Sequence, residues 1–445
     1  MSAISTELRW SLPENVILNT NLIVGGYRMR VLVIGSGGRE HVISYKLSLS
    51  PRVTKLYCAP GNGGIASIAE CVPIKATDID QIVAFAKSES IDLVFVAPED
   101  PLALGLVDRL REAQIRVFGP TAAAALIEAS KAYSKDLMKR YNIPTARYEI
   151  FDSESKALAY LESQSMPIVI KADGLALGKG VIIAQTLDEA KEAVHSMFSE
   201  KKFGQAGDVV VIEECLNGPE LTILAFADGE TAIPMVSSRD HKRALDNDLG
   251  KNTGGMGAIT PGADLSEEDE LFINEKIIDA TILALKQEGR PFEGVIYFGL
   301  MLTPEGPKVI EYNARFGDPE AQAILPRLRN DLLDIVDACI DHRLSEVVLD
   351  FKPGASCCVV MASGGYPDAY ETGYEIFGIE ESGCLVFQAG TKLVSGRPVT
   401  SGGRVLCVYA ESENLDDAIE KSYESVQKIH FNNAHYRTDI GRTGK

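Results

Sequence analysis

Residues Glu311 to Glu320 read E-Y-N-A-R-F-G-D-P-E and follow a largely apolar run. That run predicts a buried strand, and strand alternation places Glu311, Asn313 and Arg315 on one face. Two oxygen ligands beside a guanidinium suit Mg²⁺ and phosphate, because Mg²⁺ takes few carboxylates and arginine binds phosphate through paired hydrogen bonds. The segment therefore predicts a metal and phosphate site. The structural alternative is a strand that ends in a polar turn, with Arg315 paired to Glu311 or Asp318.

The composition is that of a multidomain α/β enzyme. At 445 residues the chain is too long for one core, and its length predicts about three domains. A net charge of -19 repels nucleic acid and anionic membranes, so the expected partners are small molecules. The eight cysteines form no C-x-x-C pair and indicate reduced thiols. Because there is neither a long apolar stretch nor a signal-peptide pattern, the sequence predicts a cytoplasmic protein.

The first part of the chain alternates strand-like and helix-like segments. Strands are expected at 30–34, 54–57, 91–96 and 115–118, and helices at 40–48, 80–87 and 102–113. This series predicts a parallel sheet that binds ligands at the carboxyl ends of its strands. Residues 1–28 are interpreted as an N-terminal extension that need not be ordered.

The remainder predicts a mixed α/β module followed by a C-terminal one. Ser130 is expected to cap a helix that reaches Tyr141. Strands at 168–171, 181–184 and 209–213, with a helix opened by the capping box at Thr186, predict a small α+β lid. From about residue 355, short strands, glycine-rich turns and a helix over 415–429 predict a further α+β domain.

Three loops follow neighbouring strands of the predicted parallel sheet, beginning at Gly35, Ala59 and Ala97. We expect them to meet in one crevice, where backbone amides of the first face an anion and Glu99 accepts from sugar hydroxyls. NAD binding is disfavoured, because a dinucleotide fingerprint requires glycine where this chain has Glu40. The structural alternative is a tight turn without a ligand.

A lysine stands at the end of another predicted strand. Lys171 follows an apolar run, where a charged side chain is unfavourable unless it meets an anion. The glycine-rich loop from Gly174 to Gly180 lacks the G-K-[ST] of a Walker loop and fits a mobile flap over polyphosphate. The alternative is a flexible hairpin with exposed lysines.

Acidic residues end the strand predicted at 209–213. Glu213, Glu214 and the later Glu220 could supply acceptors for adenine and ribose, or could cap a solvated strand end. The segments D-H-K-R at Asp240 and N-T-G-G-M-G at Asn252 join clustered charge to a glycine loop. They fit a small carboxylate substrate, although a charge run is more often a solvated face.

The order of these motifs resembles the ATP-grasp superfamily and, within it, the glycinamide ribonucleotide synthetase family. The resemblance covers residues 29 to about 441. Its motifs are G-G-R-E-H at Gly37, A-P-G-N at Ala59, K-A-D-G-L-A-x-G-K-G-V at Lys171, D-H-K-R at Asp240, N-T-G-G-M-G-A at Asn252, R-F-G-D-P-E at Arg315, G-G-R-V-L at Gly402 and D-I-G at Asp439. It implies an N-terminal α/β domain at 29–128, an ATP-grasp domain at 129–352 with a lid at about 147–216, and a C-terminal domain at 353–445.

By this resemblance the reaction is ligation of glycine to 5-phosphoribosylamine through glycyl phosphate, giving glycinamide ribonucleotide, ADP and phosphate. The residues at matching positions divide by implied role. Catalysis falls to Arg315, Lys171 and Asp318. ATP binding falls to Lys131, Lys171, Asp173, Gly174, Lys179, Gly180, Glu213, Glu214, Leu216 and Glu220. The phosphoribosylamine positions are Gly37, Gly38, Arg39, Glu40, Asn62, Pro98 and Glu99, and the glycine positions are Asp240, Lys242, Arg243, Gly254, Gly255 and Met256.

The implied cofactor is Mg²⁺ or Mn²⁺ on Glu311 and Asn313, with ATP as co-substrate. Many ATP-grasp enzymes carry another acidic ligand on the preceding strand, but Tyr297 to Met301 contains no acid. ATP oxygens and water are therefore expected to complete the metal site. The expected assembly is a monomer or weak homodimer. The alternatives are another ATP-grasp ligase or carboxylase of purine metabolism, and a non-catalytic protein that binds an adenine nucleotide.

Overall fold

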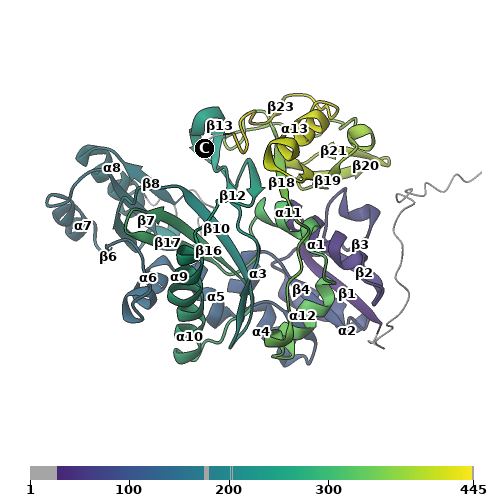
Figure 1. The fold of residues 1–445 in the computed structure, drawn as a ribbon, viewed down its shortest axis with the longest axis horizontal. Helices are drawn as coiled ribbons and strands as arrows, with labels where there is room; N and C mark the ends of the chain where they lie inside the picture. Colours follow the sequence, from purple (N-terminus) through teal and green to yellow (C-terminus); the bar gives the residue numbers. More distant parts are fainter. Residues whose placement is uncertain (1–27, 175–179, 201, 203, 443–445) are drawn as a thin grey trace, which may run out of the picture.

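The computed structural model describes residues 28–174, 180–200, 202 and 204–442. Our interpretation of residues 1–28 thus lies outside the described residues, apart from Arg28, and so does the ATP position Lys179. Figure 1 shows the N-terminal and C-terminal sheets beside each other, with a central sheet leading to a small sheet at the opposite end. In the described part of the chain, no helix is long and apolar enough to cross a membrane. The predicted α/β class is confirmed.

The N-terminal sheet is parallel and has the strand order β3-β2-β1-β4-β5. Its strands are β1 (Met29–Gly35), β2 (Val53–Pro60), β3 (Glu70–Cys71), β4 (Leu93–Val96) and β5 (Arg116–Phe118). Its helices are α1 (Gly38–Ser48), α2 (Ile79–Ser88), α3 (Glu99–Ala103), α4 (Leu106–Glu112) and α5 (Ala122–Ala129). The prediction of one helix over 102–113 is wrong, because Gly105 adopts a φ of 82° and separates α3 from α4.

The central sheet is antiparallel in the order β11-β10-β16-β17. Its strands are β10 (Glu220–Asp228), β11 (Ala232–Pro234), β16 (Glu293–Thr303) and β17 (Gly306–Asn313), and α9 (Glu267–Phe272) and α10 (Ala280–Gln287) pack beside it. A bulge interrupts β17, since Leu300 pairs with Val309 while Gly299 pairs with Glu311. One extra residue reverses the alternation, so Val309 and Tyr312 both enter the core. Glu311 is thereby turned away from it.

The small sheet is antiparallel in the order β6-β9-β7-β8. Its strands are β6 (Tyr148–Phe151), β7 (Ile168–Ala172), β8 (Val181–Ala184) and β9 (Val210–Glu214), and its helices are α7 (Glu154–Leu161) and α8 (Leu187–Phe198). Thr186 caps α8 by accepting from the Glu189 amide, as predicted. The core between sheet and helices contains Leu161, Val194 and Met197. Helix α6 (Lys131–Arg140) connects this sheet to the N-terminal unit, capped as predicted by Ser130.

The C-terminal sheet has the order β12-β15-β18-β22-β19, with β23 paired to β18. Its strands are β12 (Arg239–Asp240), β15 (Gly257–Thr260), β18 (Ala355–Ser363), β19 (Leu385–Gln388), β22 (Arg404–Ser412) and β23 (Ala434–His435). The nearby hairpins are β13 (Arg243–Leu245) with β14 (Leu249–Asn252), and β20 (Thr391–Val394) with β21 (Arg397–Thr400). Helices α11 (Glu320–Ile324), α12 (Leu332–Ile340) and α13 (Leu415–Val426) complete the described regular structure. Because β12 and β15 come from the middle of the chain, this sheet ties the expected domains together.

Candidate active site

Most of the predicted site residues gather where β17 ends, between the small sheet and the N-terminal and C-terminal sheets. They form two adjoining groups of charges. The lysine cluster consists of Lys131, Lys135, Lys171 and Lys242 with Glu213, Glu220 and Glu311. The arginine cluster consists of Arg39, Arg315 and Arg404 with Glu99, Glu128 and Asp318.

The buried part of the lysine cluster is centred on Glu213, which is 3% exposed. Lys135 Nζ lies 2.8 Å from one carboxylate oxygen, and Lys171 Nζ lies 2.9 Å from the other. Lys171 also donates to the Ile310 carbonyl at 3.0 Å, at the β17 bulge. Burial raises the pKa of Glu213, but the charges of Lys171 and Lys135 outweigh this effect, and the net pKa is below its ordinary value. Glu213 is thus an ionised partner of two lysines.

Glu311 faces the same cluster from β17. Lys242 Nζ lies 3.1 Å from its carboxylate and 3.3 Å from that of Glu220. The charge of Lys242 outweighs burial and lowers the pKa of Glu311 to about 2. Asn313, two residues on, presents its Oδ1, which accepts from Arg315 Nη2 at 3.1 Å. An ionised carboxylate and an amide oxygen at one strand end fit two ligands of a hard divalent cation.

Asp173 and Lys131 join the glycine-rich loop to the start of α6. The Asp173 carboxylate accepts from the Ala132 amide at 2.6 Å and from Ser130 Oγ at 3.1 Å. Lys131 Nζ donates to the Gly174 carbonyl at 3.1 Å, and burial lowers its pKa. Asp173 therefore holds the loop at the helix N-terminus. Gly180 lies at the other end of this loop, where its carbonyl accepts from the Ala172 amide at 2.8 Å.

The remaining predicted nucleotide positions lie at the end of β9, just after it, and at the start of β10. Glu214 pairs with Arg147, whose Nε is 2.7 Å from the carboxylate. The Glu214 side chain is 28% exposed. Leu216 follows at the strand end, where its carbonyl accepts from Cys215. The side chain of Glu220 is half-exposed and is held by Lys242. The structure thus brings these residues beside the lysines, but it directs Glu213 inward to Lys135 and Lys171.

Arg315 is the centre of the arginine cluster. Its Nε lies 3.3 Å from Glu99 and its Nη2 lies 3.0 Å from Glu128. Arg315 therefore pairs with Glu99 and Glu128, and not with Glu311 or Asp318 as in the structural alternative. Burial raises the pKa of Glu99, but Arg315 and Arg39 lower it to about 2. A fixed guanidinium is thereby placed next to Asn313 at the end of β17.

The loop after β1 meets the same cluster. Arg39 Nε lies 2.6 Å from Glu40, and its Nη1 lies 3.6 Å from Glu99 and donates to the Phe316 carbonyl at 3.1 Å. Glu40 also accepts from the Gly37 amide. Gly38 lies so close to Gln322 that an added Cβ would be 2.4 Å from its Nε2. Arg39, Glu40 and Glu99 are thus brought together at the carboxyl ends of β1 and β4, as predicted.

Asp318 connects three segments. Its carboxylate accepts from Gln322 Nε2 at 2.7 Å and from the Arg39 amide at 3.4 Å, and lies 3.3 Å from Arg404 Nη2. Arg404 belongs to β22, and its Nη1 also donates to the carbonyls of Gly254 and Gly255. The contacts of Asp318 are those of a residue that holds loops together.

A pair of carboxyl groups, one half-buried and one buried, lies beside this junction. Burial and the neighbouring charge of Glu320 raise the pKa of Asp240 well above its ordinary value. Burial likewise raises the pKa of Glu320, which is 3% exposed. Asp240 Oδ1 is shielded from solvent and has no hydrogen-bond partner in the part of the chain that the structure describes. Two such acids are suited to receive a cationic group between them.

Other predicted positions serve the surrounding structure. The Met256 side chain is fully buried in the C-terminal core. Arg243 donates to the Gly250 carbonyl within the β13–β14 hairpin. Asn62 bridges loops by donating to the carbonyls of Ser36 and Gln388. Pro98 forms the N-cap of α3, which places Glu99.

Sequence reasoning missed four residues of the two clusters and the acid pair: Lys135, Glu128, Glu320 and Arg404. Lys135 had a usable signal, because it follows Lys131 by one helical turn and lies on the same face. Glu320 and Arg404 stood within motifs that we quoted, but no role was assigned to them. Glu128 had no local signal, since only the fold carries it to Arg315.

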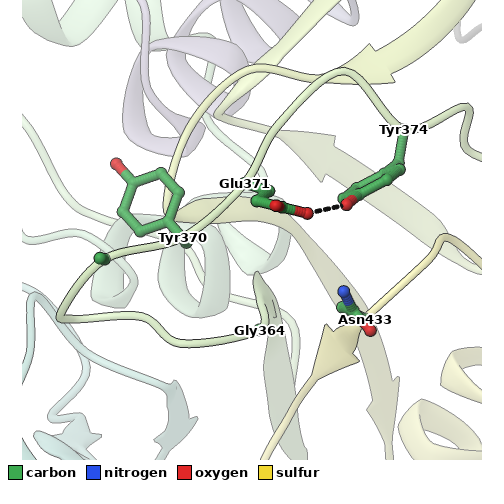
Figure 2. Close-up of a pocket in the computed structure, with 6 residues that line it drawn as sticks. Gly364, Tyr370, Glu371, Tyr374 and Asn433 are labelled. Atoms are coloured by element: carbon green, nitrogen blue, oxygen red, sulfur yellow. Dashed lines mark hydrogen bonds between the residues drawn. The ribbon is translucent and has the colours of Figure 1, made fainter.

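A separate pocket of about 430 Å³ lies on the C-terminal domain and is shown in Figure 2. Its lining comes from Gly364, Ala369, Tyr370, Glu371, Tyr374 and Asn433. Glu371 and Tyr374 point toward each other and are hydrogen-bonded. The pocket includes none of the residues of the two clusters, so it is not part of the candidate active site.

Comparisons with known proteins agree with this geometry. The family model described as phosphoribosylglycinamide synthetase, N domain, matches residues 29–128; the ATP-grasp (A) domain model of that family matches 129–321, and its C domain model matches 356–443. The chain belongs to the phosphoribosylglycinamide synthetase family. The resemblance drawn from the motifs is therefore confirmed.

Relatives with the name phosphoribosylamine–glycine ligase cover nearly the whole chain. The one from Halalkalibacterium halodurans is 51% identical over 93% of this chain and 96% of its own length. The one from Caldanaerobacter subterraneus is 47% identical over 93% and 99%. A crystal structure of the ligase from Thermotoga maritima has a TM-score of 0.80 at 34% identity and covers 92% of this chain and 100% of that one.

More distant structures show the fold alone. A biotin carboxylase from Campylobacter jejuni, in complex with an ATP analogue, has a TM-score of 0.71 at 14% identity and covers 93% of this chain and 94% of that one. The ATP-grasp architecture predicted from the motifs is thus confirmed by the family models and by structure.

Proposed function

We propose that the chain is an ATP-dependent ligase that joins glycine to 5-phosphoribosylamine and forms glycinamide ribonucleotide, ADP and phosphate. The observation that supports this most is the junction at the end of β17. There, buried lysines, an ionised Glu311, Asn313 and the fixed guanidinium of Arg315 adjoin within one site. Phosphoryl transfer to a carboxylate depends mainly on such positioning and charge neutralisation.

In this proposal the nucleotide binds on the Lys131 and Lys171 side of the lysine cluster, and Lys242 lies on the side that faces glycine. Lys131 and Lys171 contact the phosphates, since a lysine held by a carboxylate can exchange that partner for a phosphate oxygen. Glu214, Leu216 and Glu220 lie along the adenine and ribose, with Asp173, Gly174, Lys179 and Gly180 in the loop over the phosphates. Glu213 orients Lys171 through its carboxylate, which lies 2.9 Å from Lys171 Nζ.

Glu311 and Asn313 would hold a divalent cation, Mg²⁺ or Mn²⁺, that neutralises charge on the transferred phosphoryl group. The two donors fit because Glu311 is ionised and Asn313 presents an amide oxygen at the same strand end. Strand β16 opposite them carries no acid in Tyr297 to Met301, so ATP oxygens and water would complete the ligand set. Arg315, held by Glu99 and Glu128, stabilises the charge that develops as the glycine carboxylate takes up the γ-phosphoryl group.

The acceptor substrates occupy the side of the arginine cluster. Gly37, Gly38, Arg39, Glu40 and Glu99 surround the phosphoribosylamine at the carboxyl ends of β1 and β4. Asp240 and Glu320 receive the ammonium group of glycine, beside Lys242 and the Gly254–Gly255 loop. The amine then attacks glycyl phosphate, and phosphate leaves.

We also propose that the domain boundaries are those implied by the motifs, near residues 29, 129 and 353. The three family models support this division, as their matches begin at 29, 129 and 356. A cytoplasmic monomer or weak homodimer that binds only small molecules is part of the same proposal.

The deciding experiment measures ADP release with Mg²⁺-ATP and glycine, with and without freshly generated phosphoribosylamine. Alanine and serine serve as controls for the amino acid. Release that needs both glycine and the amine is the expected result. Release that instead follows another amine or bicarbonate would assign the site to a different ATP-grasp ligase or carboxylase, and release under no condition would contradict catalysis.

A further inference from the structure

We propose that Arg404, from the C-terminal sheet, is a positioning residue for the glycine side of the active site. The kinetic part of this inference rests on the proposed function. Arg404 begins β22, far in sequence from the residues it contacts. The inference is that it fixes the Gly254–Gly255 loop against the segment that carries Asp318.

The contacts of one guanidinium join these segments. Arg404 Nη1 donates to the Asp318 carbonyl at 2.6 Å and to the Gly255 carbonyl at 3.3 Å, and also to the Gly254 carbonyl. Nη2 lies 3.3 Å from the Asp318 carboxylate. The two N–H groups of Nη1 are shared among the three carbonyls while Nη2 faces the carboxylate, and a lysine has no second nitrogen with which to reach both positions.

The loop is fitted closely to this guanidinium. A Cβ on Gly254 would lie 3.0 Å from Arg404 Cζ, so the glycine rests on the face of the fork. A Cβ on Gly255 would lie 2.4 Å from Pro319 Cδ and 2.6 Å from Asp240 Oδ1. The loop is thus pressed between Arg404 and the acid that we assign to glycine.

Asp318 also links this junction to Arg39, a residue predicted to bind phosphoribosylamine. Asp318, fixed by Arg404, also accepts from the Arg39 amide and from Gln322. The lysine cluster, by contrast, is held through Glu213 and Glu311 and has no contact with Arg404 among the described residues. Loss of Arg404 should therefore disturb the acceptor side and spare the nucleotide side.

The kinetic test compares Arg404→Ala with the wild-type enzyme. We expect kcat/KM for glycine to fall about a hundredfold, because an ångström-scale misplacement of substrate costs that much, while KM for ATP changes by less than about threefold. Millimolar guanidinium should restore part of the lost activity, which a merely destabilised enzyme would not show. Arg397→Ala is the matched control, since Arg397 lies in the same domain in an exposed pair with Glu375.

Hydrogen exchange provides a readout that does not depend on activity. Without substrates, peptides covering residues 252–258 should exchange faster in Arg404→Ala than in the wild type, while peptides from the small sheet should not change. This arm decides the positioning role even if ADP release assigns the enzyme to another substrate. The same measurements on Arg404→Lys apply if the alanine variant does not fold.

Either of two results would overturn the inference. One is a folded Arg404 variant with wild-type exchange in the 252–258 loop and wild-type glycine kinetics. The other is an equal loss in the ATP and glycine parameters with no guanidinium rescue, which would indicate general damage to the fold.

Discussion

The two charged clusters around the end of β17 use different cations for different purposes. In the lysine cluster, Lys171 and Lys242 each have compact contacts to carboxylates, and Lys171 adds one carbonyl. In the arginine cluster, Arg315 and Arg404 direct different nitrogen atoms of one guanidinium to different partners, whereas each lysine uses a single Nζ. An ammonium can change partners without moving a loop, whereas a planar fork fixes the geometry of what it binds. The difference suggests that lysines receive the nucleotide and arginines build the acceptor site.

Replacement of Arg315 by lysine tests the requirement for a fork most strongly. Arg315→Lys keeps the charge beside Glu99 and Glu128 but cannot reach Asn313 in the same geometry. We expect kcat to fall about 10³-fold, since a preorganised donor to developing charge contributes that much. ADP release measures the effect, and a melting temperature near that of the wild type shows that the fold is retained.

Arg111→Lys is the matched control for this change, because Arg111 forms an exposed pair with Glu293 at 2.7 Å. It should leave kcat unaltered. Near-normal kcat in folded Arg315→Lys would mean that charge alone is sufficient at this position, and the contrast between the clusters would fail.

Removal of the charge from Lys171 tests the nucleotide side. In Lys171→Met the apolar stem is retained, but one of the two lysine partners of Glu213 is lost, and Lys135 remains. We expect KM for ATP to rise about thirtyfold, because a hydrogen bond to a charged group contributes roughly 2 kcal/mol, while KM for glycine changes little.

The control Lys191→Met removes a lysine from α8 whose partner is the exposed Glu162. It should not change KM for ATP. If Lys171→Met raised the glycine KM as much as the ATP KM, the two clusters could not be assigned to separate substrates.

Addition of one methyl group tests the fit of the acceptor loop. Gly255 has a φ of 109°, and Gly255→Ala would bring a Cβ within 2.4 Å of Pro319. The loop must shift, so we expect kcat/KM for glycine to fall at least about tenfold. Steady-state kinetics with varied glycine measure this.

Gly396→Ala controls for backbone strain, because Gly396 also has a positive φ, 79°, but a Cβ added there would meet no atom within 4 Å. It should cost some stability without altering the glycine kinetics. Equal kinetics in the two variants would show that the contact with Pro319 does not matter.

On acidification, the lysine cluster and the region next to the arginine cluster should change protonation state at different pH values. Glu311, with a pKa of about 2, stays charged until strongly acid pH. His41 follows Arg39 of the arginine cluster by two residues in α1, and it accepts from the Gln388 amide at 2.8 Å. Burial lowers the pKa of His41 to about 4. As pH falls, His41 is protonated in the unfolded chain before it is protonated in the folded protein. The contribution of neutral His41 to the free energy of unfolding is therefore complete above pH 6.5 and is lost as pH falls toward 4.

At pH 5.5 this histidine alone should lower the free energy of unfolding by about 1.4 kcal/mol relative to neutral pH, a factor of ten in the equilibrium constant. Urea denaturation at both pH values measures the difference, and His41→Asn should remove most of the contribution. His430→Asn, at an exposed position, is the control. The same pH dependence in wild type and His41→Asn would contradict the role of burial.

The sequence predicted those site residues that stand at the ends of regular elements. Lys171, Glu213, Glu311 and Arg39 were found because a charge after an apolar strand, or a loop after a parallel strand, carries a local signal. Glu128 and the ion-pair partners of Arg315 could not be found in this way. They come from segments that meet only when the N-terminal and central sheets pack together.

The sequence by itself determined the βα order, the helix caps at Ser130 and Thr186, the motifs of the family and hence the proposed location of the phosphate side. These follow from local patterns, which a chain displays before it folds. Only the tertiary structure decided that an extra residue in β17 turns Glu311 away from the core, that Glu213 faces lysines, and that Arg404 joins the Gly254–Gly255 loop to Asp318. Those outcomes depend on pairing register and on contacts between distant segments, and neither is written in a local pattern.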